Sequence, residues 1–159
     1  MNILLNDFIV GFLLNFILIC FFYKTPIMTR NGWISAGALG TILWGCIGFL
    51  GWISVVIYLI LGSLVTKLGF QYKQNIGIAE KRGGRRGPEN VWGSAATGVV
   101  FAIMIKLNIL NQSILEVAFA ASFAAKLADT FGSEIGKRFG RNTFLITTLQ
   151  KVKKGTEGG

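Results

Sequence analysis

The chain has 159 residues, a formal net charge of +9, 52% hydrophobic residues and a mean hydropathy of +0.58. These values argue against a soluble domain, because apolar stretches of membrane-spanning length, about 17–25 residues, recur along the sequence. The positive-inside rule explains the basic charge better than nucleic acid does, so no nucleic acid is expected as a partner. The chain has no histidine, which makes zinc sites and His-based acid–base catalysis poor candidates.

Five hydrophobic helices are expected in chain order, and they predict an all-α, polytopic transmembrane bundle. We expect residues 1–159 to form a single integral membrane domain. The break between the second and third helices is weak, because Gly48, Gly51 and Trp52 leave almost no polar interruption. A basic polar loop at 71–90 follows the third helix, and a short polar turn at 108–112 follows the fourth. The predicted helices are residues 3–23, 33–49, 52–68, 91–107 and a segment that begins near residue 113.

Basic residues predict the orientation of these helices. With the N-terminus outside and five alternating helices, Lys24, Arg30 and two basic segments lie inside, whereas Lys106 falls near the outer side. The two segments are the loop of residues 67–90 and the tail of residues 126–159. We therefore expect both to share the cytoplasmic face and to build one site together.

The segment 126–137 follows an Ala-rich apolar stretch with no turn signal between them, so an ionisable cluster continues directly from a membrane helix. Residues four apart share a face of a helix, and two such rows lie side by side in this segment. One row contains only small residues, and the other becomes polar from Asp129 onward. We expect the small row to admit a second helix and the polar row to point into the bundle. The alternative is a helix that becomes solvated near Lys126. The rows are Ala120, Ala124, Ala128, Gly132 and Gly136, and Ala121, Ala125, Asp129, Ser133 and Lys137.

The loop carries four cations interleaved with glycines between residues 80 and 87. Glycines expose backbone N–H groups to an anion, and arginines bind phosphate oxygens in pairs. The fourth helix starts just after Asn90 and adds its N-terminal dipole. Glu80, Glu89 and Asn90 favour a binding site over a basic loop that only fixes topology and touches anionic lipid. The pattern is not a Walker A loop, because Arg138 follows Lys137.

The tail supplies carboxylates for the same face. Asp129 and Glu134 could together hold Mg²⁺, which takes one or two carboxylates plus substrate phosphates. Residues 143–148 form a short β-like segment or a loop, and the Lys, Gly and hydroxyl residues after 150 suit nucleotide phosphates. The alternative for the last nine residues is a disordered basic terminus. Phosphoryl transfer fits such a site without histidine, because it needs mainly positioning and charge neutralisation.

Three blocks of the sequence resemble a polytopic membrane family, largely of unknown function, that includes phytyl-phosphate kinase. The blocks lie at 83–94, at 126–137, and at Leu145-Ile-Thr-Thr with Lys154-Gly-Thr-Glu-Gly-Gly159. A fainter similarity extends to dolichol kinase and CDP-diacylglycerol synthase. The resemblance implies an all-helical enzyme that uses CTP or ATP to phosphorylate an isoprenoid phosphate. It also implies residues beyond Gly159, so we expect a C-terminal truncation.

The residues and the resemblance together give the candidate site. The candidate catalytic residues are Asp129, Glu134 and Lys137, and the candidate ligands of Mg²⁺ are Asp129, Glu134 and Glu157. The candidate phosphate- and nucleotide-binding residues are Arg82, Arg85, Arg86, Asn90, Ser133, Thr147, Thr148, Lys151, Lys154, Gly155 and Thr156.

The predicted function is a transferase that moves a phosphoryl group from a nucleoside triphosphate to an isoprenoid phosphate at the cytoplasmic face. A microbial cell membrane is expected, because a plastid-type transit peptide is missing. Alternatives are a cytidylyltransferase acting on a lipid phosphate, a transporter whose polar residues line a pathway, and a structural protein that binds anionic lipid. The row of small residues adds the expectation of a homo-oligomer.

Overall fold

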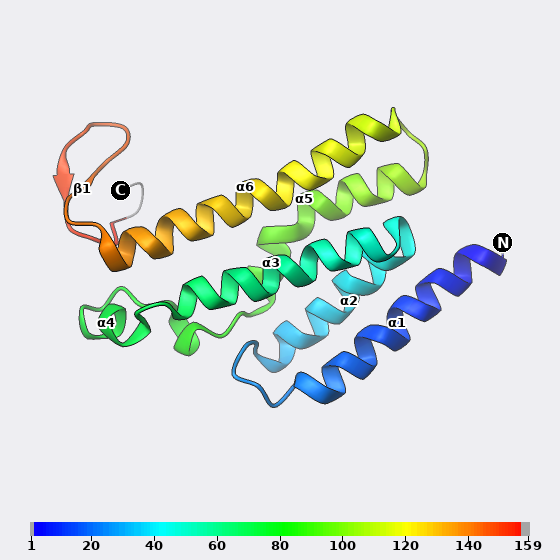
Figure 1. Ribbon diagram of the computed structural model, residues 1–159, viewed down its shortest axis with the longest axis horizontal. Helices are drawn as coiled ribbons and strands as arrows, with labels where there is room; N and C mark the ends of the chain where they lie inside the picture. The colour runs from blue at the N-terminus through cyan, green and yellow to red at the C-terminus, as the bar shows by residue number, and fades with distance from the viewer. Residues whose placement is uncertain (1, 157–159) are drawn as a thin grey trace.

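The computed structural model describes the backbone of residues 2–156 and the side chains of residues 6–156. It is an all-α bundle with five long helices where the sequence predicts them, plus a short helix after the third (Figure 1). The helices are α1 (Asn2–Phe22), α2 (Arg30–Ile47), α3 (Phe49–Lys67), α4 (Phe70–Asn75), α5 (Pro88–Lys106) and α6 (Gln112–Phe139), with a 3-10 helix η1 (Lys81–Gly84) and two-residue strands β1 (Thr143–Phe144) and β2 (Lys151–Val152). The strands pair antiparallel, which gives the β-like segment predicted after residue 143 a partner.

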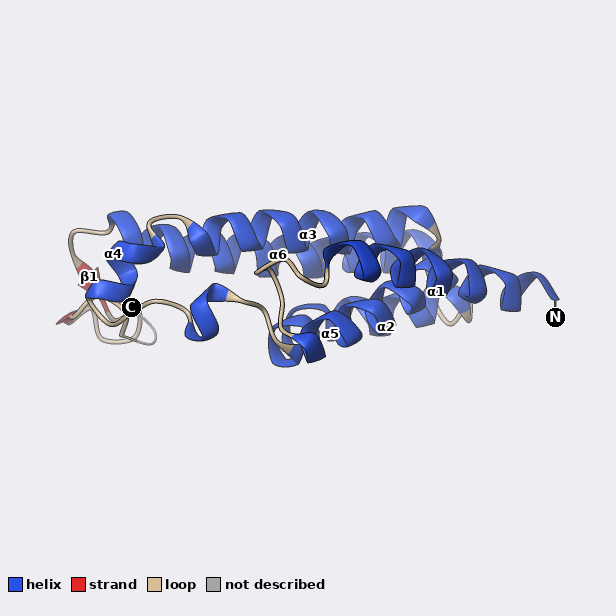
Figure 2. Ribbon diagram, turned by 90° about the horizontal axis from the view of Figure 1, so that it is seen from below, coloured by secondary structure: helices blue, strands red, loops and turns tan. Residues whose placement is uncertain are grey.

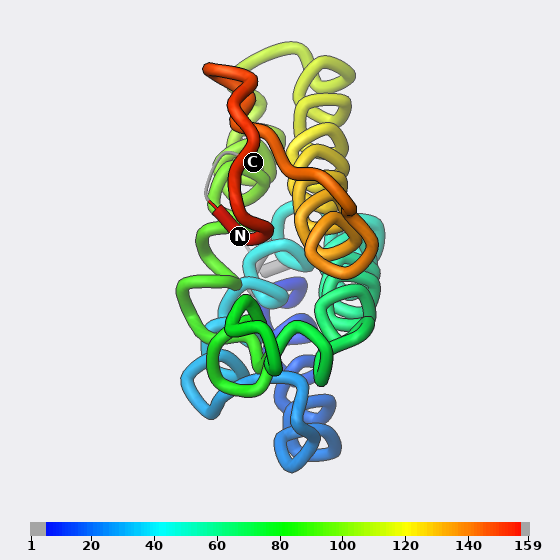
Figure 3. The backbone as a smooth tube through the Cα atoms, turned by 90° about the vertical axis from the view of Figure 1, so that its left-hand side faces the viewer, coloured from blue at the N-terminus to red at the C-terminus, as the bar shows by residue number. Residues whose placement is uncertain are grey.

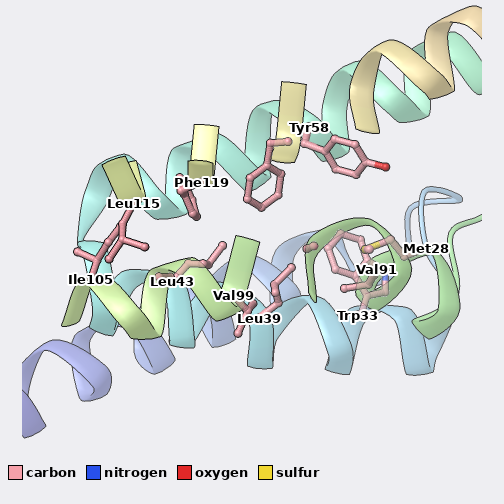
Figure 4. Packing of buried hydrophobic residues seen from close by; sticks show 13 residues of the cluster. Met28, Trp33, Leu39, Leu43, Tyr58, Val91, Val99, Ile105, Leu115 and Phe119 are labelled. Carbon is pink, nitrogen blue, oxygen red and sulfur yellow. The ribbon is translucent and has the colours of Figure 1, made fainter. Parts of the chain in front are cut away.

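Four helices form a closed ring in which α2 packs against α3 and α5, and α6 packs against the same two helices. The first helix, α1, packs on the outside of α2, and in the end-on view it lies across the bundle from α6 (Figure 3). Side chains from the ring fill its centre, including Leu43 of α2, Tyr58 of α3, Val99 of α5 and Phe119 of α6 (Figure 4). Burial of these apolar residues holds the helices side by side.

The turn between α2 and α3 depends on Gly48. Its backbone has φ 77° and ψ −150°, a conformation that is essentially restricted to glycine. A single residue can therefore reverse the chain, although the sequence has almost no polar break there. We expect Gly48→Ala to lower the free energy of unfolding by about 1–3 kcal/mol in a detergent unfolding experiment.

The matched control for that variant is Gly93→Ala. Gly93 lies inside α5, and a Cβ there would meet nothing within 4 Å. Because alanine favours helix over glycine, the control is expected to gain up to about 1 kcal/mol. Equal effects of the two substitutions would contradict the role of the turn.

Helix α6 runs unbroken through residues 126–137, as the lack of a turn signal predicts. Its buried side chains are Leu115, Phe119, Phe123 and Glu134. The expected directions of the two rows are wrong within the described chain, because all five residues of the small row are exposed and not packed against a second helix. The polar row does not point into a crowded interior either, since Asp129 and Ser133 are exposed at the edge of the bundle. Phenylalanines and leucine, rather than alanines and glycines, make the α6 seam within this chain.

The outer surface carries many large apolar side chains. Phe12, Phe16 and Phe21 of α1 are 58%, 56% and 77% exposed, and Leu64 of α3 is 62% exposed. Among the described residues, α3 is the one helix that is long and apolar enough by hydropathy to cross a membrane, and the apolar stretch Asn6–Phe22 is shorter. An apolar exterior of this extent suits a lipid environment.

The connections fall at the two ends of the bundle. The segments 23–29, 68–87 and 140–156 lie toward one end, and the α2–α3 and α5–α6 turns lie at the other with the N-terminus (Figures 1 and 2). The loop of residues 67–90 and the tail therefore share an end of the bundle, as the charge pattern predicts. Lys106 lies near the opposite end, 3.7 Å from the carboxylate of Asp7.

Candidate functional site

The site begins where two loops pair in front of α2 and α5. The Arg86 N–H donates to the Ile27 carbonyl at 2.9 Å, and the Thr29 N–H donates to the Arg86 carbonyl at 3.0 Å. Thr29 then caps α2, because its hydroxyl accepts from the Gly32 N–H at 3.0 Å. Gly32 is required at this contact, since a Cβ would overlap the Arg86 carbonyl oxygen. The irregular backbone of these two loops is thus satisfied by protein partners.

The same loop starts α5 with Pro88 at its first position. The amide oxygen of Asn90 accepts the Gly87 N–H at 3.0 Å, so part of the Asn90 side chain serves the helix start. This local folding explains why Arg86 and Asn90 sit at fixed positions although the segment is rich in glycine.

The Arg86 side chain turns inward and is only 8% exposed. Its guanidinium carbon lies 5.3 Å from the centre of the Tyr58 ring, and Nη1 is 3.4 Å from the Tyr58 hydroxyl. That hydroxyl donates to Ser94 Oγ at 2.6 Å. Gly62 makes room for the guanidinium, because a Cβ there would overlap Arg86 Nη2. Arginine binds aromatic faces through the ring quadrupole, which holds the head group in place.

Arg86 lacks an ionic partner within the described residues. No described carboxylate oxygen lies within 4.0 Å of its nitrogens, and its Nε has no hydrogen-bond partner. A buried cation without a counter-ion is costly. The arrangement therefore favours an anion at Arg86.

A buried ion-pair cluster joins α4 to α6. Lys73 is fully buried, and its ammonium donates to Glu134 Oε2 at 2.5 Å and to the Thr66 carbonyl at 2.7 Å. Lys137 donates to the other oxygen of Glu134 at 3.0 Å. Both carboxylate oxygens of Glu134 are therefore occupied by lysines. Glu134 therefore positions two groups. It holds α4 against α6 through Lys73, and it fixes the ammonium of Lys137, which lies one turn further along α6.

These features surround a cavity of about 180 Å³, here called the polar cavity. It lies between the 80–94 segment and the C-terminal half of α6, with Tyr58 and Thr66 of α3 completing its wall. The two segments that the sequence placed on one face thus meet in one cavity. The predicted site residues that line it are Arg85, Arg86, Asn90, Asp129, Ser133, Glu134 and Lys137.

Other predicted site residues lie away from the polar cavity. Arg82 forms an ion pair with Glu89 at the surface. The tail packs beside α4, where the Lys154 ammonium is 5.4 Å from the centre of the Tyr72 ring and Gly155 lies against Ile78. Glu157 lies outside the described residues. The remaining predicted residues that do not line the cavity are Thr147, Thr148, Lys151 and Thr156.

Sequence reasoning missed several residues that line or support the polar cavity. Tyr58, Gly62 and Thr66 follow one another at four-residue spacing along the otherwise apolar α3, and this row marks the face that meets the cavity. Ser94 follows Asn90 at the same spacing. Lys73 gave no comparable signal, because it lies among other polar residues in a basic loop.

The polar cavity offers limited ligands for a metal ion. Glu80, Asp129 and Glu134 line it, but lysines occupy both oxygens of Glu134, and Asp129 Oδ2 accepts from Lys126 at 2.8 Å. Within the described part of the chain, no group of three or more His, Cys, Asp or Glu residues could hold a metal ion. Mg²⁺ commonly takes only one or two carboxylates from a protein and completes its shell with waters and phosphate oxygens.

Comparison with known proteins places the chain among membrane proteins. The family described as integral membrane protein DUF92 matches residues 13–159. An uncharacterized membrane protein of Synechocystis sp. is 48% identical over 133 residues, covering 83% of this chain and 52% of that protein. Protein VTE6, chloroplastic, of Arabidopsis thaliana is 39% identical over 134 residues, covering 82% of this chain and 40% of that protein.

A third relative is an uncharacterized membrane protein of Methanocaldococcus jannaschii, 32% identical over 135 residues, covering 85% of this chain and 54% of that protein. The chain thus spans about half the length of the curated relatives it matches. No solved structure matches it.

Proposed function

Because the chain belongs to the DUF92 family of integral membrane proteins, we propose that it carries a membrane-embedded site for phosphoryl transfer. The donor would be a nucleoside triphosphate, CTP or ATP, and the acceptor an isoprenoid phosphate. The family assignment confirms the resemblance found in the sequence, and the similarity to protein VTE6 supports a prenyl-phosphate kinase-like role.

One observation carries the proposal. The polar cavity gathers cations from segments far apart in the sequence, namely Arg85 and Arg86 of the loop and Lys126 and Lys137 of α6, in one wall with the carboxylates of Glu80, Asp129 and Glu134. Phosphoryl transfer relies on such positioning and charge neutralisation. The cations would bind the phosphates of donor and acceptor, and Mg²⁺ held by Asp129 would neutralise charge on the transferred group.

The acceptor makes a strong general base unnecessary. A phosphate monoester has a second pKa of about 6, so its attacking oxygen is already ionised at neutral pH. Asp129 would therefore act mainly as a metal ligand, and Glu134, held by two lysines, would position Lys137. The hydroxyl of Ser133 lies in the same wall and would bind a phosphate oxygen.

The tail would complete the donor site. The segment 140–156 lies at the end of the bundle where α6 ends (Figure 1). It contains the candidate donor-site residues Thr147, Thr148, Lys151, Lys154, Gly155 and Thr156, and Glu157 follows them in the sequence. We place this end at the cytoplasmic face, with five membrane crossings and the N-terminus outside. The support is the charge distribution, since Lys106 is the one basic residue at the opposite end among the described residues.

The site's place in the bundle favours a transferase over a transporter. A transport site is expected near the bilayer midplane between repeats, whereas the polar cavity forms where a loop meets the C-terminal half of α6. Transfer from CTP to a lipid phosphate as a cytidylyl group remains the second chemical outcome, and product analysis distinguishes the two.

The test is a transfer assay with purified protein in detergent, phytyl phosphate, and CTP or ATP labelled in separate reactions at the γ-phosphate and at the α-phosphate, with and without Mg²⁺. Mg²⁺-dependent transfer of the γ-label to a lipid diphosphate, with release of the nucleoside diphosphate, is the expected result. Transfer of the α-label of CTP to the lipid, with release of pyrophosphate, would instead show the cytidylyltransferase. Absence of any lipid product with either nucleotide would contradict the proposed function.

A further inference from the structure

A second cavity, of about 280 Å³, lies between α1, α2, α3 and the start of α5, and is here called the apolar cavity. Its wall consists largely of aliphatic side chains such as Leu18 and Ile19 of α1, Leu39 of α2, and Val55 and Leu59 of α3. Phe22 and Ile60 also line it and are 47% and 52% exposed, so the cavity reaches the outer surface of the bundle. An apolar molecule could enter from surrounding lipid.

Polar groups in this wall are few and differ in their partners. Asn15 is satisfied, because its amide donates to the Gly11 carbonyl at 2.7 Å and accepts from Trp52 Nε1 at 3.1 Å. Arg86 is 8% exposed and satisfied only in part, since Nη1 is 3.4 Å from the Tyr58 hydroxyl but Nε has no partner. Trp33 Nε1 in the same wall also lacks a partner, but it carries no charge. The apolar cavity therefore has one electropositive end, at Arg86.

Arg86 also lines the polar cavity, as do Tyr58 and Asn90. The two cavities share this wall, with an aliphatic chamber on one side and the cluster of cations on the other. A ligand that fits both has a hydrocarbon chain and an anionic head. A neutral lipid would leave the buried guanidinium without a counter-ion.

We propose that the apolar cavity binds the single hydrocarbon chain of a lipid monophosphate, with its phosphate held by Arg86 at the shared wall. Arginine matches phosphate oxygens through paired N–H donors. The Asn90 amide nitrogen would complete the head-group contacts, because the start of α5 uses only the oxygen of that side chain. This inference rests on the proposed function for the identity of the lipid as acceptor, but the binding site can be tested without turnover.

Trp33 and Trp52 line the apolar cavity and provide the probe. In a background with Trp44→Phe and Trp92→Phe, dodecyl phosphate brominated at its terminal carbon should quench tryptophan fluorescence saturably. Ala36 lines the cavity and Ala38 is exposed on the same helix, so Ala36→Phe should abolish the saturable part and Ala38→Phe should retain it.

A second pair of variants, on α3, tests the same cavity if Ala36→Phe does not fold. Val56→Phe fills the cavity, whereas Ile57→Phe points outward from the next position. Thermal unfolding checks each variant. Quenching that is equal in the filling and the outward variants would reflect partition into the micelle and would overturn the chain site.

The head group is tested with Arg86→Gln. Affinity for the brominated alkyl phosphate should fall roughly ten- to a hundredfold, because a hydrogen-bonded charge is lost. Affinity for the matching brominated alcohol should not change, and Arg86→Lys should recover part of the phosphate binding. Equal affinity of the original protein for phosphate and alcohol would overturn the role of Arg86.

The two proposals fail separately. Saturable binding in the apolar cavity without any nucleotide-dependent product would support the lipid site and contradict the proposed phosphoryl transfer. Phosphoryl transfer at an unchanged rate in Ala36→Phe and Val56→Phe would support the proposed reaction and contradict the lipid site.

Discussion

Replacing Glu134 by glutamine is expected to lower the free energy of unfolding by about 3–5 kcal/mol. The substitution removes the negative charge that neutralises the fully buried Lys73 ammonium and leaves it only uncharged acceptors, the Thr66 carbonyl and the amide oxygen of the new side chain. Removing one member of a buried ion pair is costly because the remaining charge stays desolvated. The measurement is thermal or denaturant unfolding of the purified protein in detergent.

The control on the same helix is Glu116→Gln. Glu116 is exposed and accepts a hydrogen bond from the Gln112 side chain, so its replacement should change stability by no more than about 0.5 kcal/mol. The double variant Lys73→Met with Glu134→Met should recover most of the loss, since apolar replacement of a buried pair is often neutral. Equal stability of Glu134→Gln and the control would contradict the buried cluster.

Replacing Asp129 by asparagine should reduce phosphoryl transfer roughly 100- to 1000-fold, the scale for loss of one electrostatic contributor to a transition state. The protein should still fold, because the Asp129 side chain is 61% exposed and pairs at the surface with Lys126. Initial rates in the labelled-nucleotide assay, together with a melting curve, separate these effects.

Asp7→Asn is the matched control for that prediction. Asp7 lies near the opposite end of the bundle beside Lys106, so the same chemical change should leave the transfer rate unchanged. Full activity of Asp129→Asn would remove Asp129 from the catalytic site.

The helices could be predicted from the sequence because hydropathy and length determine them. The continuation of α6 through residues 126–137 follows from the missing turn signal. The turn between α2 and α3 was harder to predict, because Gly48, a single residue of positive φ, replaces the polar break that usually separates two helices. No pattern in the lysine-rich tail predicted that Lys154 lies against Tyr72 of α4.

The meeting of the loop and α6 could also be predicted, because the charge pattern put both at one end. Which face of α6 is buried could not. Phe119 and Phe123 bury more apolar surface than the alanine row, so they decide the seam, and Asp129 ends at the edge. Lys73 was unpredictable, since its burial depends on Glu134, a partner 61 residues away.

The membrane topology and the site roles are proposals that extend this structure. The surface that a homo-oligomer would use is uncovered in this chain, because Gly132 and Gly136 are exposed and a Cβ at either would meet nothing within 4 Å. The predicted homo-oligomer, the microbial cell membrane and the use of Mg²⁺ stay predictions.

The central claim is that the loop and α6 form one phosphate-binding site, and nucleotide binding tests it most directly. CTP and ATP binding to purified protein with Mg²⁺ should weaken roughly tenfold or more in Arg85→Gln of the loop and in Lys137→Gln of α6. The double variant should lose less than the sum of the two free energies, because both cations contact one ligand. Arg30→Gln, away from the polar cavity, should bind normally. Binding that neither substitution weakens, or no binding of either nucleotide, would contradict the account.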